Sequence, residues 1–381
     1  MTRLLPAALA AALLVAGCQS VGRAAYSRDA LHDASPVFRL ESGAARDRAR
    51  FVAEVTAAAA APTDGAFDLL ALSSGGANGA YGAGVLVGWS ERGDRPVFEV
   101  VTGVSIGALM APWAFIGASR DADLEAAFTD GRTEHLLKPR WAGAVIQPGL
   151  YQTGPLRALV SRAVDDRLLD EVARGHREGR RLYVATTSMD TREQVIWDLG
   201  ALAASGRPDA RDLFIDILTA ASSVPGAFAP VPITLETKTG LIREVHADGR
   251  LTANFFVAPE TVLDGGQALF RPDDLAAPGR IWVIVNGSPE EAFRIEPYSN
   301  VSLIGRALEA MLNAATRLSL IATRQFAQLN GLELSVTTSG PYGADRPFDF
   351  DRDRMVALFR HGRASVRDHG GWKAAAKSEP V

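Results

Sequence analysis

The chain has 381 residues, of which 47% are hydrophobic, so it can bury a large core in one domain or in two smaller ones. Its formal net charge of −4 and its pI near 5.9 exclude the basic surface by which proteins bind nucleic acid, and we expect no nucleic acid partner. Glycine occurs 36 times, which suits an α/β protein with tight loops.

The N-terminus has the pattern of an export signal. Arg3 supplies a positive charge, the segment Leu4 to Val15 consists almost entirely of Leu and Ala, and small residues follow up to Gly17. This order is typical of a signal peptide, so we predict that residues 1–17 are removed. The apolar run of about 12 residues is too short to span a bilayer.

Cys18 is the only cysteine of the chain, so an internal disulfide is excluded. The sequence Val15-Ala16-Gly17-Cys18 resembles the bacterial lipobox, in which the cysteine is lipidated and becomes the new N-terminus. The alternative is an ordinary signal peptide followed by a chance cysteine. The lipobox implies a protein of the bacterial envelope that is tethered to a membrane through Cys18. Gln19, rather than Asp, after the cysteine favours the outer membrane.

The rest of the chain is predicted to form a tether followed by one large domain. Residues 18–65 are predicted to form the tether and a helix that lies over the domain, and they end in a Pro-Thr-Asp-Gly break. The domain is expected at residues 66–373, before a polar and disordered tail at 374–381. We find no internal repeats.

Short apolar strands alternate with helical patterns through this domain. This alternation predicts an α/β fold with a mostly parallel central sheet that helices flank on both faces. Helical patterns are clearest at 213–221 and 304–329. The strand candidates are Phe67–Leu72, Val97–Thr102, Leu182–Thr187, Val195–Asp198 and Ile281–Asn286.

The pattern Gly-x-Ser-x-Gly is centred on Ser105, between a predicted strand and a helical segment at 108–116. Strand, Gly-x-Ser-x-Gly and helix form the nucleophile elbow of serine hydrolases, in which the flanking Gly103 and Gly107 relieve crowding at a sharp turn. The alternative is a serine that simply caps the helix. Pro112 should kink this helix, because proline removes a helical hydrogen bond.

A glycine-rich loop lies 30 residues earlier, at Ser74–Gly84, and also joins a strand to a helix. Backbone amides of Gly75, Gly76 and Ala77 could converge on a developing oxyanion. A P-loop is excluded because the loop contains no lysine, and the dinucleotide pattern fails because Val87 stands where its last glycine belongs. A purely structural glycine loop remains an alternative.

The serine needs a base, and histidine is the usual one. His361 and His369 follow the serine in the order of an α/β-hydrolase triad, but both lie in Arg- and Asp-rich stretches that are typical of solvated helix faces. The other choice is an aspartate that acts directly on the serine.

These motifs together resemble the patatin-like phospholipase family over about residues 66 to 290. In that family a glycine-rich oxyanion loop comes first, then Gly-x-Ser-x-Gly, and then an Asp-Gly pair that completes a Ser-Asp dyad. Here Asp248-Gly249 supplies the pair, and the block Ala221–Pro230 resembles the serine-proline-phenylalanine block that precedes it. The resemblance implies Ser105 and Asp248 as the catalytic pair, with Gly75, Gly76 and Ala77 as the oxyanion hole.

Asp264-Gly265-Gly266 is a rival for the aspartate, because the family usually has Gly or Ala where Arg250 stands. The family pattern places an asparagine six residues after the aspartate, and Asn254 fits Asp248 whereas Phe270 follows Asp264. We therefore prefer Asp248. Asn78 is a further departure, since many members have a basic residue there.

Arg250 bears on the strength of the base. A salt bridge from Arg250 would lower the pKa of Asp248 and weaken it as a base, so we expect the Arg250 side chain to point away from the carboxylate.

The sequence thus predicts a membrane-anchored lipid acyl hydrolase of the phospholipase A or lysophospholipase type. Its substrate would be membrane phospholipid or another acyl-ester lipid, and the resemblance implies neither a metal nor a cofactor. Two alternatives remain open. One is a triad esterase that uses His361 or His369, and the other is an inert lipoprotein that binds lipid or scaffolds the envelope.

Overall fold

The structure is a computed structural model that describes residues 23–34, 36–139, 149–238, 240–266, 268–270, 275, 279–288, 295, 298–340, 348–368 and 370–374. The predicted signal peptide, the lipidation site Cys18 and nearly all of the predicted tail lie outside these residues. The predicted domain boundaries therefore stay predictions.

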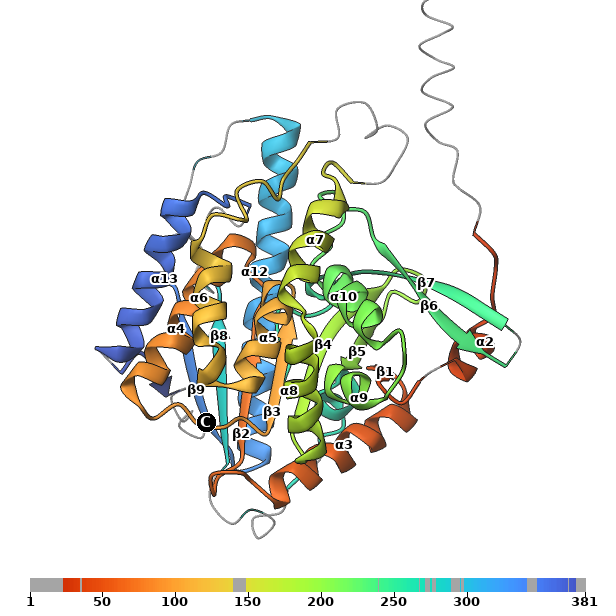
Figure 1. The fold of residues 1–381 in the computed structure, drawn as a ribbon, viewed down its shortest axis with the longest axis horizontal. Coiled ribbons are helices and arrows are strands. Elements are labelled where there is room, and N and C mark those ends of the chain that lie inside the picture. The colour runs from red at the N-terminus through yellow and green to blue at the C-terminus, as the bar shows by residue number, and fades with distance from the viewer. Residues whose placement is uncertain are drawn as a thin grey trace, which may run out of the picture.

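One sheet of ten strands runs through the described part of the chain (Figure 1). Its five central strands are parallel, which confirms the predicted mostly parallel sheet. Antiparallel strands extend both edges. In spatial order the strands are β1 (Arg39–Glu41), β5 (Gln194–Asp198), β4 (Arg181–Ser188), β3 (Val100–Val104), β2 (Asp68–Leu72), β8 (Arg280–Val285), β9 (Glu333–Thr338) and β10 (Lys373–Ala374).

A hairpin of β6 (Val231–Thr237) and β7 (Gly240–Asp248) branches from this sheet. The last residues of β7 pair antiparallel with β4, so that Asp248 lies opposite Thr186. Because β4 and β3 are parallel neighbours, the hairpin brings the end of β7 to the edge of the sheet where β3 also ends. We call this the carboxyl edge of the sheet.

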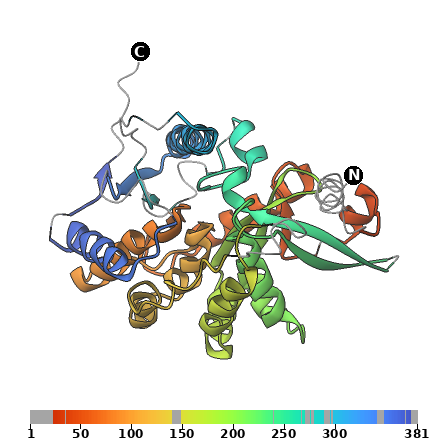
Figure 2. The same cartoon turned by 90° about the horizontal axis from the view of Figure 1, so that it is seen from above.

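Both faces of the sheet are buried, because helices cover each of them. Neighbouring residues of a strand point to opposite faces, so they pack into different cores. Leu70 and Leu72 of β2 pack into one core cluster, and Leu69 and Ala71 into the other. Figure 2 shows the two helical layers on opposite sides of the sheet. One face carries α4 (Gly79–Arg92), α5 (Ile106–Ile116), α6 (Asp121–Thr129), α7 (Thr153–Ala163), α8 (Asp166–Arg177), α9 (Leu199–Ala204), α10 (Ala210–Ala221) and α13 (Arg352–Arg367).

The other face carries α3 (Ala45–Ala60), α11 (Glu260–Asp264) and α12 (Asn300–Leu329). A short helix, α2 (Arg28–Asp33), precedes β1, and three turns of 3₁₀ helix lie at Gly76–Asn78, Ala118–Arg120 and Gly249–Leu251. No helix in the described part of the chain has the length and apolarity needed to cross a bilayer.

Most predicted strands coincide with observed ones, but β3 begins at Val100 rather than at Val97. The Glu99 carboxylate accepts hydrogen bonds from the backbone amides of Thr63 and Asp68, at 2.9 and 3.0 Å. The residues before Val100 therefore close a loop at the edge of the sheet instead of extending the strand.

Candidate active site

Ser105 occupies the sharp turn between β3 and α5. Its φ of 57° and ψ of −122° lie in a region that residues with a Cβ rarely adopt. Among the described residues other than glycine, only Arg192 shares a positive φ. Such a conformation costs on the order of 1–3 kcal/mol, so the surrounding packing must hold it in place.

Two glycines make the turn possible. A Cβ on Gly107 would lie 2.3 Å from the carbonyl oxygen of Leu72, and a Cβ on Gly103 would lie 2.6 Å from the carbonyl oxygen of Gly107. Both distances are far below van der Waals contact, so only glycine fits at either position. The Gly-x-Ser-x-Gly pattern therefore has a steric cause in this fold.

Asp248 meets Ser105 across this turn. The Ser105 hydroxyl Oγ donates a hydrogen bond of 2.6 Å to Oδ2 of Asp248. The second carboxylate oxygen, Oδ1, accepts from the backbone amide of Arg250 at 2.9 Å. Ser105 is 5% exposed and Asp248 is fully buried. Each carboxylate oxygen thus has a donor in a site from which water is nearly excluded.

The surroundings raise the pKa of Asp248 from 3.8 to about 6. Burial is the largest cause, because a carboxylate loses its hydration in the protein interior. The positive charge of Arg250 and the hydrogen bonds from Ser105 and from the Arg250 amide act in the opposite direction. Asp248 is therefore a stronger base than an exposed aspartate, yet it is still ionised at neutral pH.

The position of the Arg250 side chain agrees only in part with the prediction that this side chain points away from Asp248. The described residues contain no salt bridge between the two side chains, and Nε of Arg250 is buried without a hydrogen-bond partner among them. The guanidinium nevertheless lies close enough for its charge to lower the pKa of Asp248. Arg250 thus acts on Asp248 through space rather than through an ion pair.

The predicted oxyanion residues lie beside this pair. The glycine loop leaves β2 next to the turn that follows β3, and Gly76 lines the same cavity as Ser105. Gly76 has a φ of 57°, which glycine tolerates without strain. Within the described part of the chain, the amides of Gly75, Gly76 and Ala77 have no hydrogen-bond acceptor. Of these three residues, Gly76 is partly exposed and lines the cavity, whereas Gly75 and Ala77 are buried.

Asn286, at the end of β8, holds the glycine loop in place. Its side-chain amide donates to the carbonyl oxygen of Ser73 at 2.8 Å, and its Oδ1 accepts from the amide of Gly82 at 3.1 Å. A Cβ on Gly75 would lie 2.3 Å from the backbone oxygen of Asn286. From the sequence, Asn286 is predicted only as the end of a strand, although polar residues at the carboxyl ends of parallel strands often belong to a site.

Two further polar residues contact the loop. Asn254, which helped to select Asp248, accepts hydrogen bonds from the amide and the hydroxyl of Ser74 through its own backbone and side-chain oxygens. Asn78 accepts from Arg354 of α13 at 2.7 Å. A basic side chain therefore reaches Asn78 from a distant part of the sequence, which no local pattern could reveal.

The two serines that follow α10 form hydrogen bonds with the backbone of Ser105 and of Asp248. The hydroxyl of Ser222 donates to the backbone oxygen of Ser105 at 3.2 Å, and the amide of Asp248 donates to the backbone oxygen of Ser223 at 3.0 Å. Both serines belong to the block Ala221–Pro230 that the family resemblance identified. This block supports both partners from one side.

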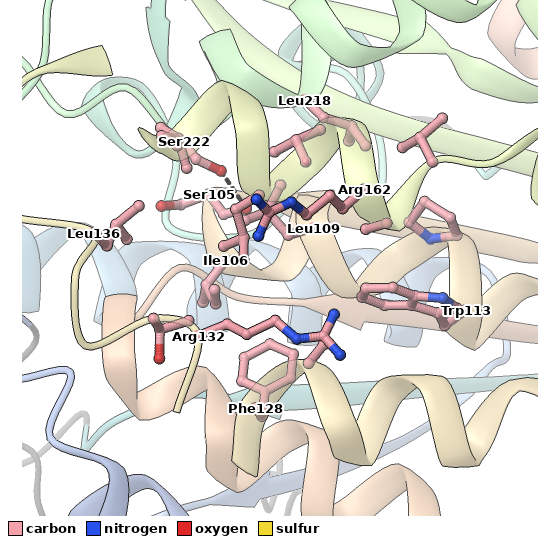
Figure 3. A pocket seen from close by; sticks show the side chains of 18 of the residues that line it. Ser105, Ile106, Leu109, Trp113, Phe128, Arg132, Leu136, Arg162, Leu218 and Ser222 are labelled. Carbon is pink, nitrogen blue, oxygen red and sulfur yellow. Dashed lines mark hydrogen bonds between the residues drawn. The ribbon is translucent and has the colours of Figure 1, made fainter. Parts of the chain in front are cut away.

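A cavity of about 230 Å³ opens from Ser105 (Figure 3). It follows α5 past Leu109 to Pro112, so this proline forms part of the cavity wall. Most of the lining is apolar and comes from α5, α6, α7 and α10. Arg132 and Arg162 point into the cavity from opposite walls.

The other candidates lie elsewhere. Asp264 ends α11, is exposed and has no contact with Ser105. His361 is exposed on α13, where its ring lies 5.7 Å from that of Tyr81, and His369 lies outside the described residues. In the segment 130–180, residues 140–148 also lie outside the described residues. Tyr151 of that segment packs against Phe228.

A strained serine after a parallel strand, with a buried aspartate and a glycine loop beside it, defines an α/β protein with a nucleophile elbow. The model of the patatin-like phospholipase family matches residues 70–266, which is more than half of the chain. This chain therefore belongs to the patatin-like phospholipase family, whose membership suggests lipid acyl hydrolase activity.

Among solved structures, the chain is similar to VipD from Legionella pneumophila. The two are 12% identical with a TM-score of 0.34, over 78% of this chain and 67% of that one. Among curated proteins, none matches this chain.

Proposed function

We propose that the protein is a serine lipid acyl hydrolase that uses a Ser105–Asp248 dyad. The observation that carries this proposal is the 2.6 Å hydrogen bond from the Ser105 hydroxyl to a fully buried carboxylate. The strained turn at Ser105, the free amides of the glycine loop and the apolar cavity support the same assignment. The family membership supports a lipid as the substrate.

In the proposed reaction, Ser105 Oγ attacks the ester carbonyl carbon while its proton passes to Oδ2 of Asp248. The carbonyl oxygen becomes an oxyanion, which the amides of Gly75, Gly76 and Ala77 stabilise. The intermediate collapses, the C–O bond to the alcohol breaks, and the leaving alcohol takes the proton from Asp248. Water then attacks the acyl-enzyme and gives its proton to Asp248, which returns it to Ser105 as the fatty acid leaves.

A carboxylate suffices as the base because of its surroundings. An exposed aspartate has a pKa near 3.9 and is a weak base towards a hydroxyl. Burial brings the pKa of Asp248 closer to neutral pH, and the existing hydrogen bond fixes the geometry of proton transfer. A well-placed oxyanion donor contributes on the order of 3 kcal/mol to lowering the barrier.

The cavity indicates which part of the substrate is bound. Its walls of Leu109, Leu156, Val160 and Leu218 offer an acyl chain a place out of water, directly beside the attacking hydroxyl. We infer that the acyl chain of a phospholipid or lysophospholipid lies there, with the ester at Ser105.

We further propose that the protein is a bacterial lipoprotein, anchored through lipidated Cys18 to the outer membrane. The support is the lipobox-like sequence Val15–Cys18 and Gln19 after it. Metabolic labelling with a palmitate analogue tests this assignment. Label should enter the wild-type chain and be absent from Cys18→Ser.

The dyad is tested by comparing Ser105→Ala and Asp248→Asn with wild type on p-nitrophenyl esters and on phospholipid vesicles. Both variants should lose at least 10³-fold in kcat/KM, while circular dichroism shows an unchanged fold. A fluorophosphonate probe should label wild type at Ser105 and leave Ser105→Ala unlabelled. Wild-type turnover in either variant would defeat the dyad, and failure of the probe to label the folded wild type would favour the inert lipoprotein.

A further inference from the structure

The first turn of the C-terminal helix α13 lies beside the active site. Met355 lines the cavity that opens from Ser105, and Phe350, just before the helix, lines it as well. Arg354 is the neighbour of Met355 in the same turn, and its side chain extends to Asn78 of the glycine loop, 276 positions earlier in the sequence. The helix α13 therefore contributes to the cavity wall and also contacts the loop that borders the cavity.

Arg354 bridges the segment before α13 and the glycine loop. Its Nη2 donates a hydrogen bond of 2.7 Å to the side-chain oxygen of Asn78, and its Nη1 donates one of 3.0 Å to the backbone oxygen of Asp349. Its Nε lies 3.9 Å from the Asp349 carboxylate, and the side chain is only 16% exposed. The guanidinium is thus held from two sides. Its hydrogen bond to Asn78 is charge-assisted, and such a bond is stronger than one between neutral groups.

Asn78 is the residue at which the glycine loop passes into a helix. It ends the 3₁₀ turn Gly76–Asn78, directly before α4, and is 2% exposed. Its backbone amide donates to the carbonyl oxygen of Gly75 at 3.1 Å, and this hydrogen bond closes the turn. Because the turn contains Gly76, which lines the cavity together with Ser105, a shift of Asn78 would also move Gly76.

The helices α4 and α13 pack with their backbones in contact. A Cβ on Gly84 of α4 would overlap the backbone oxygen of Phe359, and a Cβ on Gly362 of α13 would overlap the backbone oxygen of Tyr81. Glycine at these positions allows the close approach of the two helices. Since α4 follows directly after Asn78, this packing fixes where α13 begins relative to the glycine loop.

One role for Arg354 would be to dock α13 on the domain, but the helix has other contacts for docking. It buries apolar side chains in the larger core cluster, among them Met355, Leu358 and Phe359. The hydrogen bond from Arg354 instead restrains the loop, at the very residue that ends its turn. The contact with Asn78 is therefore placed to act on the loop rather than on the helix.

We propose that Arg354 is a positioning residue for the reaction and that it acts through Asn78. Its hydrogen bond holds the turn Gly76–Asn78 in the conformation in which the loop amides meet the oxyanion. Preorganised donors stabilise a transition state most strongly, because they need no movement at the moment of reaction. This inference rests on the proposed function, since an oxyanion forms only if Ser105 attacks an ester.

Steady-state kinetics of the full chain on p-nitrophenyl butyrate test this role. Arg354→Gln should lower kcat by about tenfold or more and leave KM nearly unchanged, because the oxyanion forms only during the reaction. Arg354→Lys, which keeps the positive charge and a donor, should recover much of this loss. Arg360→Gln is the matched control at an exposed position of α13, and it should behave like wild type.

A double-mutant cycle tests whether Arg354 acts through Asn78. Asn78→Ala removes the acceptor and should lower kcat to a similar extent. The variant with both changes should be little worse than either single variant, because both changes remove the same hydrogen bond. Thermal unfolding followed by circular dichroism gives the Tm of each variant, and Asn78→Ala tests the proposal even if Arg354→Gln does not fold.

Three results are decisive against the proposal. An unchanged kcat in Arg354→Gln would overturn it, and a lower Tm with that unchanged kcat would limit Arg354 to docking α13. Losses that add up in the double variant would also overturn it, because Arg354 would then act independently of Asn78. Failure of the proposed function looks different, since wild type itself would neither hydrolyse the ester nor react with a fluorophosphonate probe.

Discussion

The Ser105 hydroxyl and the Asp248 carboxylate are 2.6 Å apart although 143 positions separate them in the sequence. The hydrogen bond exists because β3 and β7 both end at the carboxyl edge of the sheet, where β4 lies between them. The proton of the serine and its acceptor are thus aligned before any substrate binds, and several consequences can be measured.

Activity should fall on the acid side of pH 6. Burial raises the pKa of Asp248 to about 6, and only the ionised carboxylate can accept the Ser105 proton. The profile of kcat/KM should therefore be flat above that pH and decline by about tenfold per pH unit below it. A p-nitrophenyl ester assay between pH 4 and 8 measures this limb. An acid limb near pH 4 would show that Asp248 behaves as an exposed carboxylate.

Stability should change in the opposite direction. A carboxyl group whose pKa is higher in the folded than in the unfolded state stabilises the fold below the unfolded pKa, and this contribution is lost as pH rises through the folded pKa. With values of 3.8 and about 6, Asp248 costs about 3 kcal/mol at pH 7. Asp248→Asn should thus melt higher than wild type at pH 7, and the difference should shrink towards pH 4. A lower Tm for the variant at pH 7 would contradict this account.

Arg250 should set the position of the acid limb. Its positive charge lowers the pKa of Asp248 against the effect of burial. Arg250→Gln removes the charge but keeps the backbone amide that donates to Asp248, so the limb should move to higher pH, while Arg250→Lys should restore it. The measurement is the pH profile of kcat/KM for all three proteins. Identical limbs would mean that the charge does not reach the carboxylate.

Gly107→Ala should disrupt the nucleophile turn. The added Cβ would lie 2.3 Å from the Leu72 carbonyl oxygen, so β2 and α5 must separate at a cost of about 1–3 kcal/mol. We expect a lower Tm and a large loss of fluorophosphonate labelling. Gly154→Ala is the control, because a Cβ there meets nothing within 4 Å. Equal behaviour of the two variants would refute the steric argument.

Asn286→Ala should loosen the oxyanion loop without touching the dyad. It removes the hydrogen bonds to the Ser73 carbonyl and from the Gly82 amide. Because the oxyanion forms only during the reaction, kcat should fall by about 10²-fold or more while KM changes little. Steady-state kinetics on a soluble ester separate the two constants. A change confined to KM would place Asn286 in substrate binding instead.

The sequence was sufficient for the parts of the site that local motifs encode. The turn at Ser105 and the glycine loop each combine a strand end with glycines whose necessity is steric, so their pattern survives in the sequence. The central strands β2, β4 and β8 were also predictable, because strands buried on both faces are nearly continuous apolar runs.

What the sequence could not show depends on contacts between distant segments. Strand β9 is half-polar and gives no apolar run, and its place beside β8 follows from parallel pairing alone. Arg354 reaches Asn78 from the last helix, and the hydroxyl of Ser222 reaches the backbone of Ser105. None of these contacts can be predicted from the spacing of residues in the sequence, because each depends on how the helical layers pack against the sheet.

The anchoring of the glycine loop by Asn286 and by Arg354 also affects when the site can be assembled. Both residues are synthesised long after Ser105, and Asp248 also follows it by more than a hundred positions. A nascent chain therefore lacks the residues that align its serine with Asp248 and hold the glycine loop. The site would be assembled only once the C-terminal helix α13 has docked, so a chain that is still being synthesised would carry its serine in an inactive form.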